Sequence, residues 1–294
     1  MGFEQCHPAV NLFYFIFVMY GMLTFKHPVF LLISFLSAFL YSVKRNGKKA
    51  MIFNVILIPL VVVFALYYST YTHFGITVIK KNMIGNNITM EAFVYGIVLG
   101  IVAAGVMIWF SCVFSIFSSD KVVYLFGRLS PKLALYFSVL LRLIPRIKQE
   151  GKKINEAQRG IGKGVNQGNI FVRMRNCIRI FSMLITWTIE AVTTASESMR
   201  SRGSSLRGRK AFSIYRFDNR DRAFVIVMFT FIIITLVGVA LGQMTSIYNP
   251  RIIVPQTTSA SWLFYIGYTA LCLMPLILEL WTEYSFKRAR KIVN

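Results

Sequence analysis

Four uninterrupted apolar runs, each long enough to cross a lipid bilayer, constrain this chain more than any other feature. They cover residues 51–71, 92–117, 223–242 and 262–281. A membrane-spanning helix needs about 20 mostly apolar residues, and only the last run contains a charge, Glu279 near its end. Only 15% of the residues are charged, against about 25% in soluble domains. The chain is therefore predicted to be an all-α integral membrane protein.

Two shorter apolar runs, residues 10–25 and 29–43, precede these four and are separated by Lys26, His27 and Pro28. At a rise of ~1.5 Å per residue the first covers roughly 24 Å, short of the ~30 Å hydrocarbon core. The two runs form either a tight pair of spans or a short re-entrant hairpin. Both alternatives return the chain to the same side, so the sequence predicts about six transmembrane helices.

The distribution of basic residues predicts the orientation. Six spans place all but four of the 33 Lys and Arg residues on one side of the membrane, and the exceptions are Lys26, Lys80, Lys81 and Arg251. Because Lys and Arg concentrate in cytoplasmic segments, we expect both termini in the cytoplasm. The net charge of +22 does not indicate nucleic-acid binding, because basic nucleic-acid modules are not built from long apolar runs.

Residues 118–222 contain two further apolar segments, 122–145 and 177–195, and charges interrupt or flank both. Arg128, Lys132 and Arg142 lie in the first, and a cation at the centre of a span costs about 2.5–3.5 kcal/mol. As a span, the second would put basic clusters on opposite sides of the membrane. Neither segment is predicted to cross the bilayer, which divides the chain into residues 1–117, 118–222 and 223–294.

Both segments have helical periodicity with one wide apolar face. The apolar positions repeat every three or four residues: Leu133, Phe137, Leu140, Ile144 and Ile147, then Phe171, Met174, Ile178, Phe181 and Ile185. We expect two long amphipathic helices on the cytoplasmic side, the first kinked at Pro145. The Gly-rich stretch 160–168 should separate them.

Each amphipathic helix is followed by an Arg-Gly pair, Arg159-Gly160 and Arg202-Gly203. The ordinary interpretation is helix termination, because glycine is common just past a helix and a terminal cation complements the helix dipole. Two such pairs within one basic insertion favour a functional interpretation.

The run LFGRLSPKLALYFSVLLRLIPRIKQEGKKINEAQRG, residues 125–160, and the run ESMRSRG, residues 197–203, resemble the transmembrane T component of energy-coupling factor transporters, the EcfT/CbiQ family. Members of that family carry two short Ala-Arg-Gly motifs at the ends of long coupling helices. In the second motif, Arg202 and Gly203 match, Ser201 replaces the usual alanine, and Met199 lies beside it.

The first motif has two possible alignments. If Ala157-Gln158 is matched to the usual Ala-Gln, Ile161 occupies the arginine position and Gly162 the glycine position. If the Arg-Gly pair is matched instead, Arg159 and Gly160 carry the motif, which we favour because it retains the charge.

The resemblance implies a coupling subunit of a bacterial or archaeal cell membrane, without cofactor or catalytic residue. Its partners would be two ABC ATPases and one membrane-embedded S component that captures a vitamin or metal ion. The motif residues would dock the ATPases. The sequence names neither the substrate nor whether the T component serves one S component or several.

Two other classes are less well supported. The stretch GIGKG is not a phosphate-binding P-loop, because Ala157 stands at the first glycine position and Gly164 follows Lys163. A secondary transporter with its own midplane site would need ionisable residues within the spans, which are almost free of charge. That second class stays open as the alternative.

Overall fold

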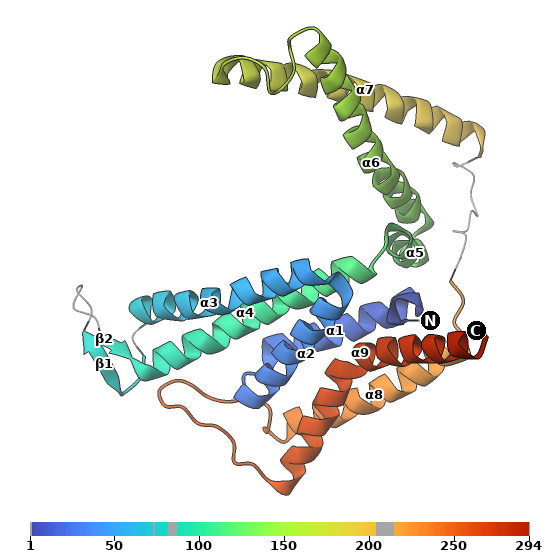
Figure 1. Cartoon of the computed structure of the whole chain (residues 1–294). Coiled ribbons are helices and arrows are strands. Elements are labelled where there is room, and N and C mark those ends of the chain that lie inside the picture. The colour runs from blue at the N-terminus through green and yellow to red at the C-terminus, as the bar shows by residue number, and fades with distance from the viewer. Residues whose placement is uncertain (1, 73, 82–86, 204–214, 294) are drawn as a thin grey trace. The chain divides into compact units, whose positions relative to one another are not determined.

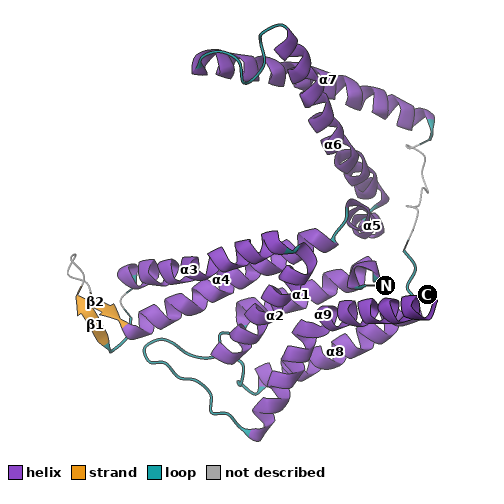
Figure 2. Cartoon of the chain, in the orientation of Figure 1, coloured by secondary structure: helices purple, strands orange, loops and turns teal. Residues whose placement is uncertain are grey.

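The computed structural model describes the chain except residues 1, 73, 82–86, 204–214 and 294. It divides into two compact units: unit 1 is Met1–Ser118 with Tyr215–Asn294, and unit 2 is Ser119–Ile214. Among the described residues almost all regular structure is helical, apart from one small hairpin (Figure 2). The all-α membrane fold predicted from the sequence is confirmed.

Unit 1 is a helical bundle with a short hairpin between two of its helices (Figure 1). Its described elements are η1 (Phe3–Gln5), α1 (Pro8–Thr24), α2 (Pro28–Asn46), α3 (Lys48–Tyr71), β1 (Val78–Lys81), β2 (Asn87–Thr89), α4 (Met90–Ile116), α8 (Asn219–Ala240) and α9 (Ser259–Val293). Helix α2 packs between α4 and α9, α3 flanks α4, and α8 flanks α9. The two strands pair antiparallel, with Val78 opposite Thr89.

Histidine and proline together start the first two helices. Pro8 and Pro28 occupy their first turns, where the missing N–H costs nothing. The Nδ1 atoms of His7 and His27 accept hydrogen bonds from the N–H groups of Ala9 and Val29, at 3.2 and 3.3 Å. The Lys26–Pro28 stretch is thus the turn between two separate helices, as the interrupted apolar pattern indicated.

Six of the described helices are long and apolar enough to cross a membrane, which equals the number predicted, but the set differs. It comprises α2, α3, α4, α8, α9 and also α7 (Ile170–Ser201), whereas α1 falls just short in length. The sequence placed α7 outside the membrane. Helix α7 qualifies because most of its arginines lie at its two ends, although it is the least apolar and least buried of the six. The protein is a multi-pass membrane protein.

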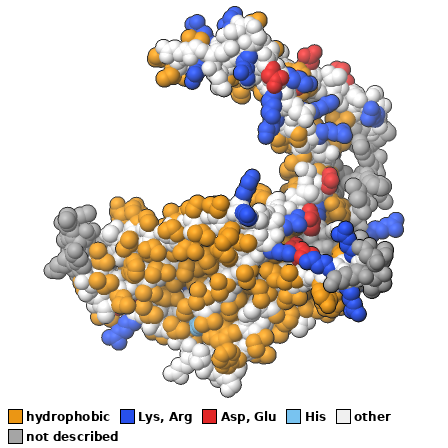
Figure 3. Space-filling view, viewed as in Figure 1, with side chains coloured by type: hydrophobic (Ala, Val, Ile, Leu, Met, Phe, Trp, Pro, Cys, Tyr) orange, Lys and Arg blue, Asp and Glu red, His pale blue; other side chains and the backbone are white. Residues whose placement is uncertain are grey.

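The surface of unit 1 is more apolar than a soluble bundle would tolerate. Hydrophobic side chains cover most of its visible face (Figure 3). On α3 the positions turned outward include Ile52, Val63 and Tyr67, each about three-fifths exposed. Four of the six inward positions of the same helix are small or polar (Ala50, Asn54, Ala65 and Ser69), and the other two are Leu57 and Val61. This inverted distribution suits a helix whose outer face contacts lipid.

Helices α3 and α4 approach closely because small residues line their contact. An ideal Cβ on Gly96 would lie 3.0 Å from the Cα of Ala65, and one on Gly100 would lie 2.9 Å from Cγ1 of Val61. The two glycines are four residues apart and therefore on one face of α4. Such small-residue faces allow helices to pack by van der Waals contact inside a membrane, where no hydrophobic effect drives association.

Replacing Gly96 by leucine should separate α3 from α4. Because the obstructing atoms belong to the α3 backbone, the strain cannot be relieved by a side-chain rotation. We expect Gly96→Leu to lower the free energy of unfolding by about 1–3 kcal/mol, measured by thermal or detergent-induced unfolding in micelles. Gly160→Leu is the control, because an ideal Cβ there meets no atom within 4 Å. Equal stability of the two variants would contradict the close packing.

Candidate functional site

Unit 2 holds the candidate docking residues, and its described residues, 119–203, form three helices. They are α5 (Ser119–Leu129), α6 (Pro131–Gly160) and α7. The apolar segment 122–145 is therefore not one helix, since the chain breaks at Ser130, immediately before the proline that starts α6. The rings of Phe126 and Phe137 stack at 4.3 Å and hold α5 against α6. Helix α6 continues through Pro145.

Helices α6 and α7 pack against each other along part of their length (Figure 1). Gly151 of α6 faces Leu184 of α7, and Gln158 Nε2 lies 3.8 Å from Met183 Sδ. Further along, Arg146 of α6 and Trp187 of α7 line a groove of about 540 Å³ together with Glu190, Ala191, Thr194, Ala195 and Ser198. The pair is thus a single packed element.

The predicted apolar faces of these helices are present, but other residues of unit 2 bury few of their side chains. Leu140 and Ile144 on α6 are more than half exposed, as are Met174, Ile178 and Phe181 on α7. Only Asn176 and Ile180 of α7 are buried. Apolar faces of this size mark contacts with a partner or a membrane.

The loop that joins α6 to α7 is held by two asparagines, one from each helix. Asn155 Oδ1 accepts a hydrogen bond from the N–H of Val165 at 3.1 Å, and Asn176 Nδ2 donates to the carbonyl of Gly164 at 3.2 Å. Asn176 is buried. The glycines of residues 160–168 do separate the helices, as predicted. The two asparagines were missed, because neither lies on the apolar face predicted for its helix and no motif singles them out.

The residues of the predicted second motif lie at the end of α7. Ser201 is the last helical residue, Arg202 is the C-cap, and Gly203 adopts a left-handed conformation with φ +77°. The N–H of Gly203 donates to the carbonyl of Arg200 at 3.0 Å. Because a left-handed residue after the C-cap is most easily glycine, Gly203 ends the helix and leaves Arg202 exposed at its tip.

The end of α6 differs from the end of α7, so the two Arg-Gly pairs do not occupy equivalent positions. Gly160 is the last residue of the helix, the C-cap is Ile161, and the left-handed residue is Gly162 with φ +75°. The N–H of Gly162 donates to the carbonyl of Arg159 at 3.1 Å, and the N–H of Lys163 donates to that of Gln158 at 2.8 Å. This is the double bond pattern of a Schellman motif.

By position in the helix end, Ile161-Gly162 therefore corresponds to Arg202-Gly203, and Arg159 corresponds to Arg200. The geometry matches the alignment that pairs Ala157-Gln158 with the usual Ala-Gln. Arg159 nevertheless remains an exposed cation near the tip of α6. Within the described residues, no recorded ion pair involves Arg159 or Arg202, and no group of three His, Cys, Asp or Glu residues could hold a metal ion.

Among curated proteins, the chain is similar to three energy-coupling factor transporter transmembrane proteins. It is 33% identical to EcfT 1 of Listeria monocytogenes over 101 residues, which are 33% of this chain and 38% of that protein. It is 33% identical to EcfT of Lacticaseibacillus paracasei over 94 residues, 31% of this chain and 34% of that protein. It is 33% identical to EcfT of Lactobacillus helveticus over 110 residues, 37% of this chain and 38% of that protein.

These comparisons confirm the resemblance to the T component of energy-coupling factor transporters. The matched stretch spans little more than a third of each relative's length. No protein-family model matches the chain.

Alanine at the two left-handed glycines should loosen both helix ends. A residue with a Cβ pays about 1–2 kcal/mol in this conformation, so Gly203→Ala and Gly162→Ala should each speed amide exchange in the last turn of their helix. Hydrogen–deuterium exchange of peptides covering residues 154–162 and 196–203 measures this. Gly160→Ala should leave exchange unchanged or slower, since Gly160 lies within α6 and alanine favours the helix. Faster exchange in Gly160→Ala would show that Gly160 terminates α6.

Proposed function

We propose that this protein is the transmembrane coupling subunit of an energy-coupling-factor importer. Two ABC ATPases would dock at the tips of α6 and α7, and one S component would bind substrate. The ATPases supply hydrolysis, so the subunit itself is not an enzyme and needs no cofactor. One observation carries the proposal: two long helices with largely exposed apolar faces each end at a left-handed glycine, and an exposed arginine lies directly before Gly203 (Arg202) and three residues before Gly162 (Arg159), in a chain similar to EcfT proteins.

The chemistry at the tip of α7 suits docking to an acidic groove. Arg202 has a guanidinium free to make charge-assisted hydrogen bonds to a carboxylate, each worth roughly 1.5–3 kcal/mol. Gly203 turns the chain away without a Cβ that would collide with the partner. Ser201 and Met199 lie on the same final turns of α7 and complete the proposed docking motif.

At the tip of α6 we propose Arg159 as the docking cation and Gly162 as the glycine that turns the chain. Ala157, Gln158 and Gly160 then support the arginine from the last turn of the helix. Because Arg159 lies two residues before the C-cap, its side chain would reach a partner from the side of α6 rather than from its end.

We propose that α7 lies on the cytoplasmic side with α6 and does not cross the bilayer. A spanning α7 would place Arg173 and Arg175 opposite Arg200 and Arg202, against the tendency of basic residues to stay in the cytoplasm. Helix α1 then pairs with α2 to complete six crossings, and both termini face the cytoplasm of a bacterial or archaeal cell. Residues 1–117 and 223–294 form the membrane part, and residues 118–222 form the coupling part.

The alternative, a secondary transporter, gains nothing from the described residues. Three buried carboxylates of the spans lie at the ends of their apolar runs: Glu91 and Asp221 in the first turns of α4 and α8, and Glu279 near the close of the α9 run. Glu279 accepts a hydrogen bond from Tyr41 at 3.2 Å. Ion-coupled transport would require such groups near the bilayer midplane.

Reversing the charge at the tip of α7 should prevent docking. Arg202→Glu places an anion against the proposed acidic groove, and truncating or reversing one side of a desolvated charge pair costs at least about 2–5 kcal/mol. We expect co-purification of the ATPases with tagged protein to fall about tenfold or more, with membrane insertion unchanged. Arg179→Glu is the control, because it makes the same change at an exposed position of α7 far from the tip. ATPase recovery equal to the control would refute docking by Arg202.

The proposed orientation can be tested by labelling. In a variant without its four native cysteines, a cysteine at Gln167, between α6 and α7, should react with a membrane-impermeant maleimide only after the cells are opened. A cysteine at Thr257, before α9, should react in intact cells. Labelling of Gln167 from outside would show either that the topology is inverted or that α7 crosses the membrane.

A further inference from the structure

Unit 2 is joined to unit 1 by two connections only: the chain leaves unit 1 after Ser118 and returns at Tyr215. On the side of unit 1, the first connection follows the end of α4, and the second precedes the start of α8. Both of these helix ends contact one short segment, Phe3–His7, directly or through a single side chain.

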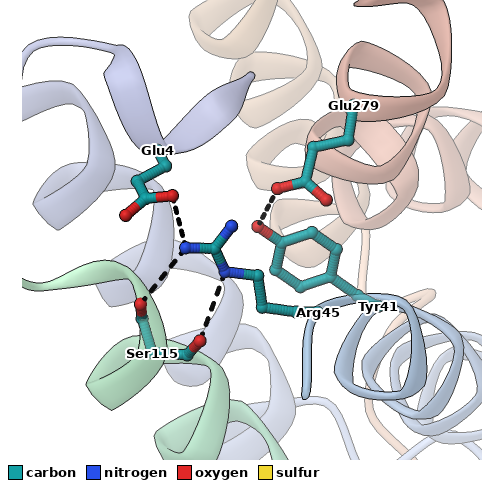
Figure 4. Close-up of polar contacts among 5 residues, drawn as sticks. All are labelled: Glu4, Tyr41, Arg45, Ser115 and Glu279. Atoms are coloured by element: carbon teal, nitrogen blue, oxygen red, sulfur yellow. Dashed lines mark hydrogen bonds and ion pairs between the residues drawn. The ribbon is translucent and has the colours of Figure 1, made fainter. Parts of the chain in front are cut away.

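At the first connection the link is Arg45, the penultimate residue of α2 (Figure 4). Its Nε donates to Ser115 Oγ at 3.2 Å, its Nη2 donates to the Ser115 carbonyl at 3.4 Å, and Nη2 is also ion-paired with Glu4. Ser115 lies in the last turn of α4, where carbonyls lack partners within the helix. A cation at this position satisfies one of them and complements the helix dipole.

At the second connection the link is Asp221, which is buried in the first turn of α8. Its Oδ1 accepts a hydrogen bond from the N–H of His7 at 3.2 Å, and its Oδ2 accepts one from the N–H of Asp218 at 3.2 Å. The ring of His7 lies edge-on to Phe217, with centroids 5.5 Å apart. The carboxylate thus joins the Phe3–His7 segment to the helix start with both of its oxygens in use.

Between these two links the segment is anchored by Phe3, which is completely buried. Its ring lies 5.3 Å from that of Tyr14 on α1 and 5.5 Å from that of Phe224 on α8. The segment is therefore held at three points, and all of these contacts lie within unit 1.

We infer that Glu4, His7, Arg45, Ser115 and Asp221 form a junction clamp that fixes the end of α4 to the start of α8. This inference rests on the proposed coupling function, in which unit 2 moves when the ATPases close. Helix ends fray at low cost in free energy, and a fraying end would absorb the displacement of unit 2. The clamp residues are positioning residues, because they make the two helix ends respond to that displacement as one body.

The first test uses hydrogen–deuterium exchange of the protein in nanodiscs. Arg45→Gln should raise exchange about tenfold in residues 111–118 and also in residues 3–7 and 217–222, because all three are held through one segment. Lys44→Gln is the control: it removes the neighbouring Lys44–Glu283 ion pair of 2.7 Å, which reaches α9 and neither connection. A rise confined to residues 111–118 would overturn the clamp.

A second variant, Asp221→Asn, perturbs the clamp at the second connection. The same measurement should again show faster exchange at residues 111–118. Asp218→Asn is the control. It removes one charge from the same helix end but leaves the acceptor of the His7 N–H intact, so exchange at residues 111–118 should stay at the wild-type level. A rise confined to residues 217–222 in Asp221→Asn would also overturn the clamp.

The second test asks whether the two helix ends move together in the complex with the ATPases and S component. Spin labels on cysteines replacing Phe114 and Arg222, both exposed beside clamp residues, report the distance between the ends. When Mg·ATP and vanadate are added, the distribution of distances between the labels should be unchanged in wild type. In Arg45→Gln and Asp221→Asn it should broaden. A nucleotide-dependent change in wild type would refute the clamp. Failure of wild type to bind ATPases would refute the proposed function instead, and the exchange test would still decide on the clamp.

Discussion

The lipid bilayer offers no hydrogen-bond partners, and this constraint shapes the whole of unit 1. Backbone groups must pair within each segment, so the spans are helical. Since lipid tails are as apolar as leucine, the large hydrophobic side chains of α3 gain nothing by facing inward, and many face outward. Close approach then depends on small residues, as at Gly96 and Gly100 against α3. Polar contacts join the helices inside the bundle, as between Tyr14 and the Cys272 carbonyl, and also where the helices end.

The contacts at the helix ends involve charged side chains and link a helix end to another helix or to the Phe3–His7 segment. Arg45 bonds α2 to the end of α4, and Asp221 bonds the start of α8 to the Phe3–His7 segment. Each places a charge where the helix dipole favours it. Both lie next to the connections to unit 2, where the proposed coupling subunit would receive force.

Unit 2 follows other rules. Its helices α6 and α7 are amphipathic, they pack on each other through Gly151, and asparagines hold their loop. Much apolar surface remains exposed on both. Exposure on this scale is tolerable in a complex or at a membrane but not in a free soluble domain, and this is the physical reason that we propose partners for unit 2.

The sequence by itself determined the helical membrane fold, the amphipathic helices, their glycine-rich link and the end of α7 at Arg202-Gly203, because these depend on residue order and local periodicity. It misjudged the end of α6, since an Arg-Gly pair does not reveal which glycine takes the left-handed conformation: Gly162 does, and Gly160 stays helical. The sequence also predicted six spans, but its set includes α1 and excludes α7, whereas hydropathy and length select α7 and exclude α1. Hydropathy alone does not separate α7 from a span. Only the tertiary structure decided the contacts of Glu4, Arg45 and Asp221, because those residues lie up to about two hundred positions apart and meet only when the helices pack.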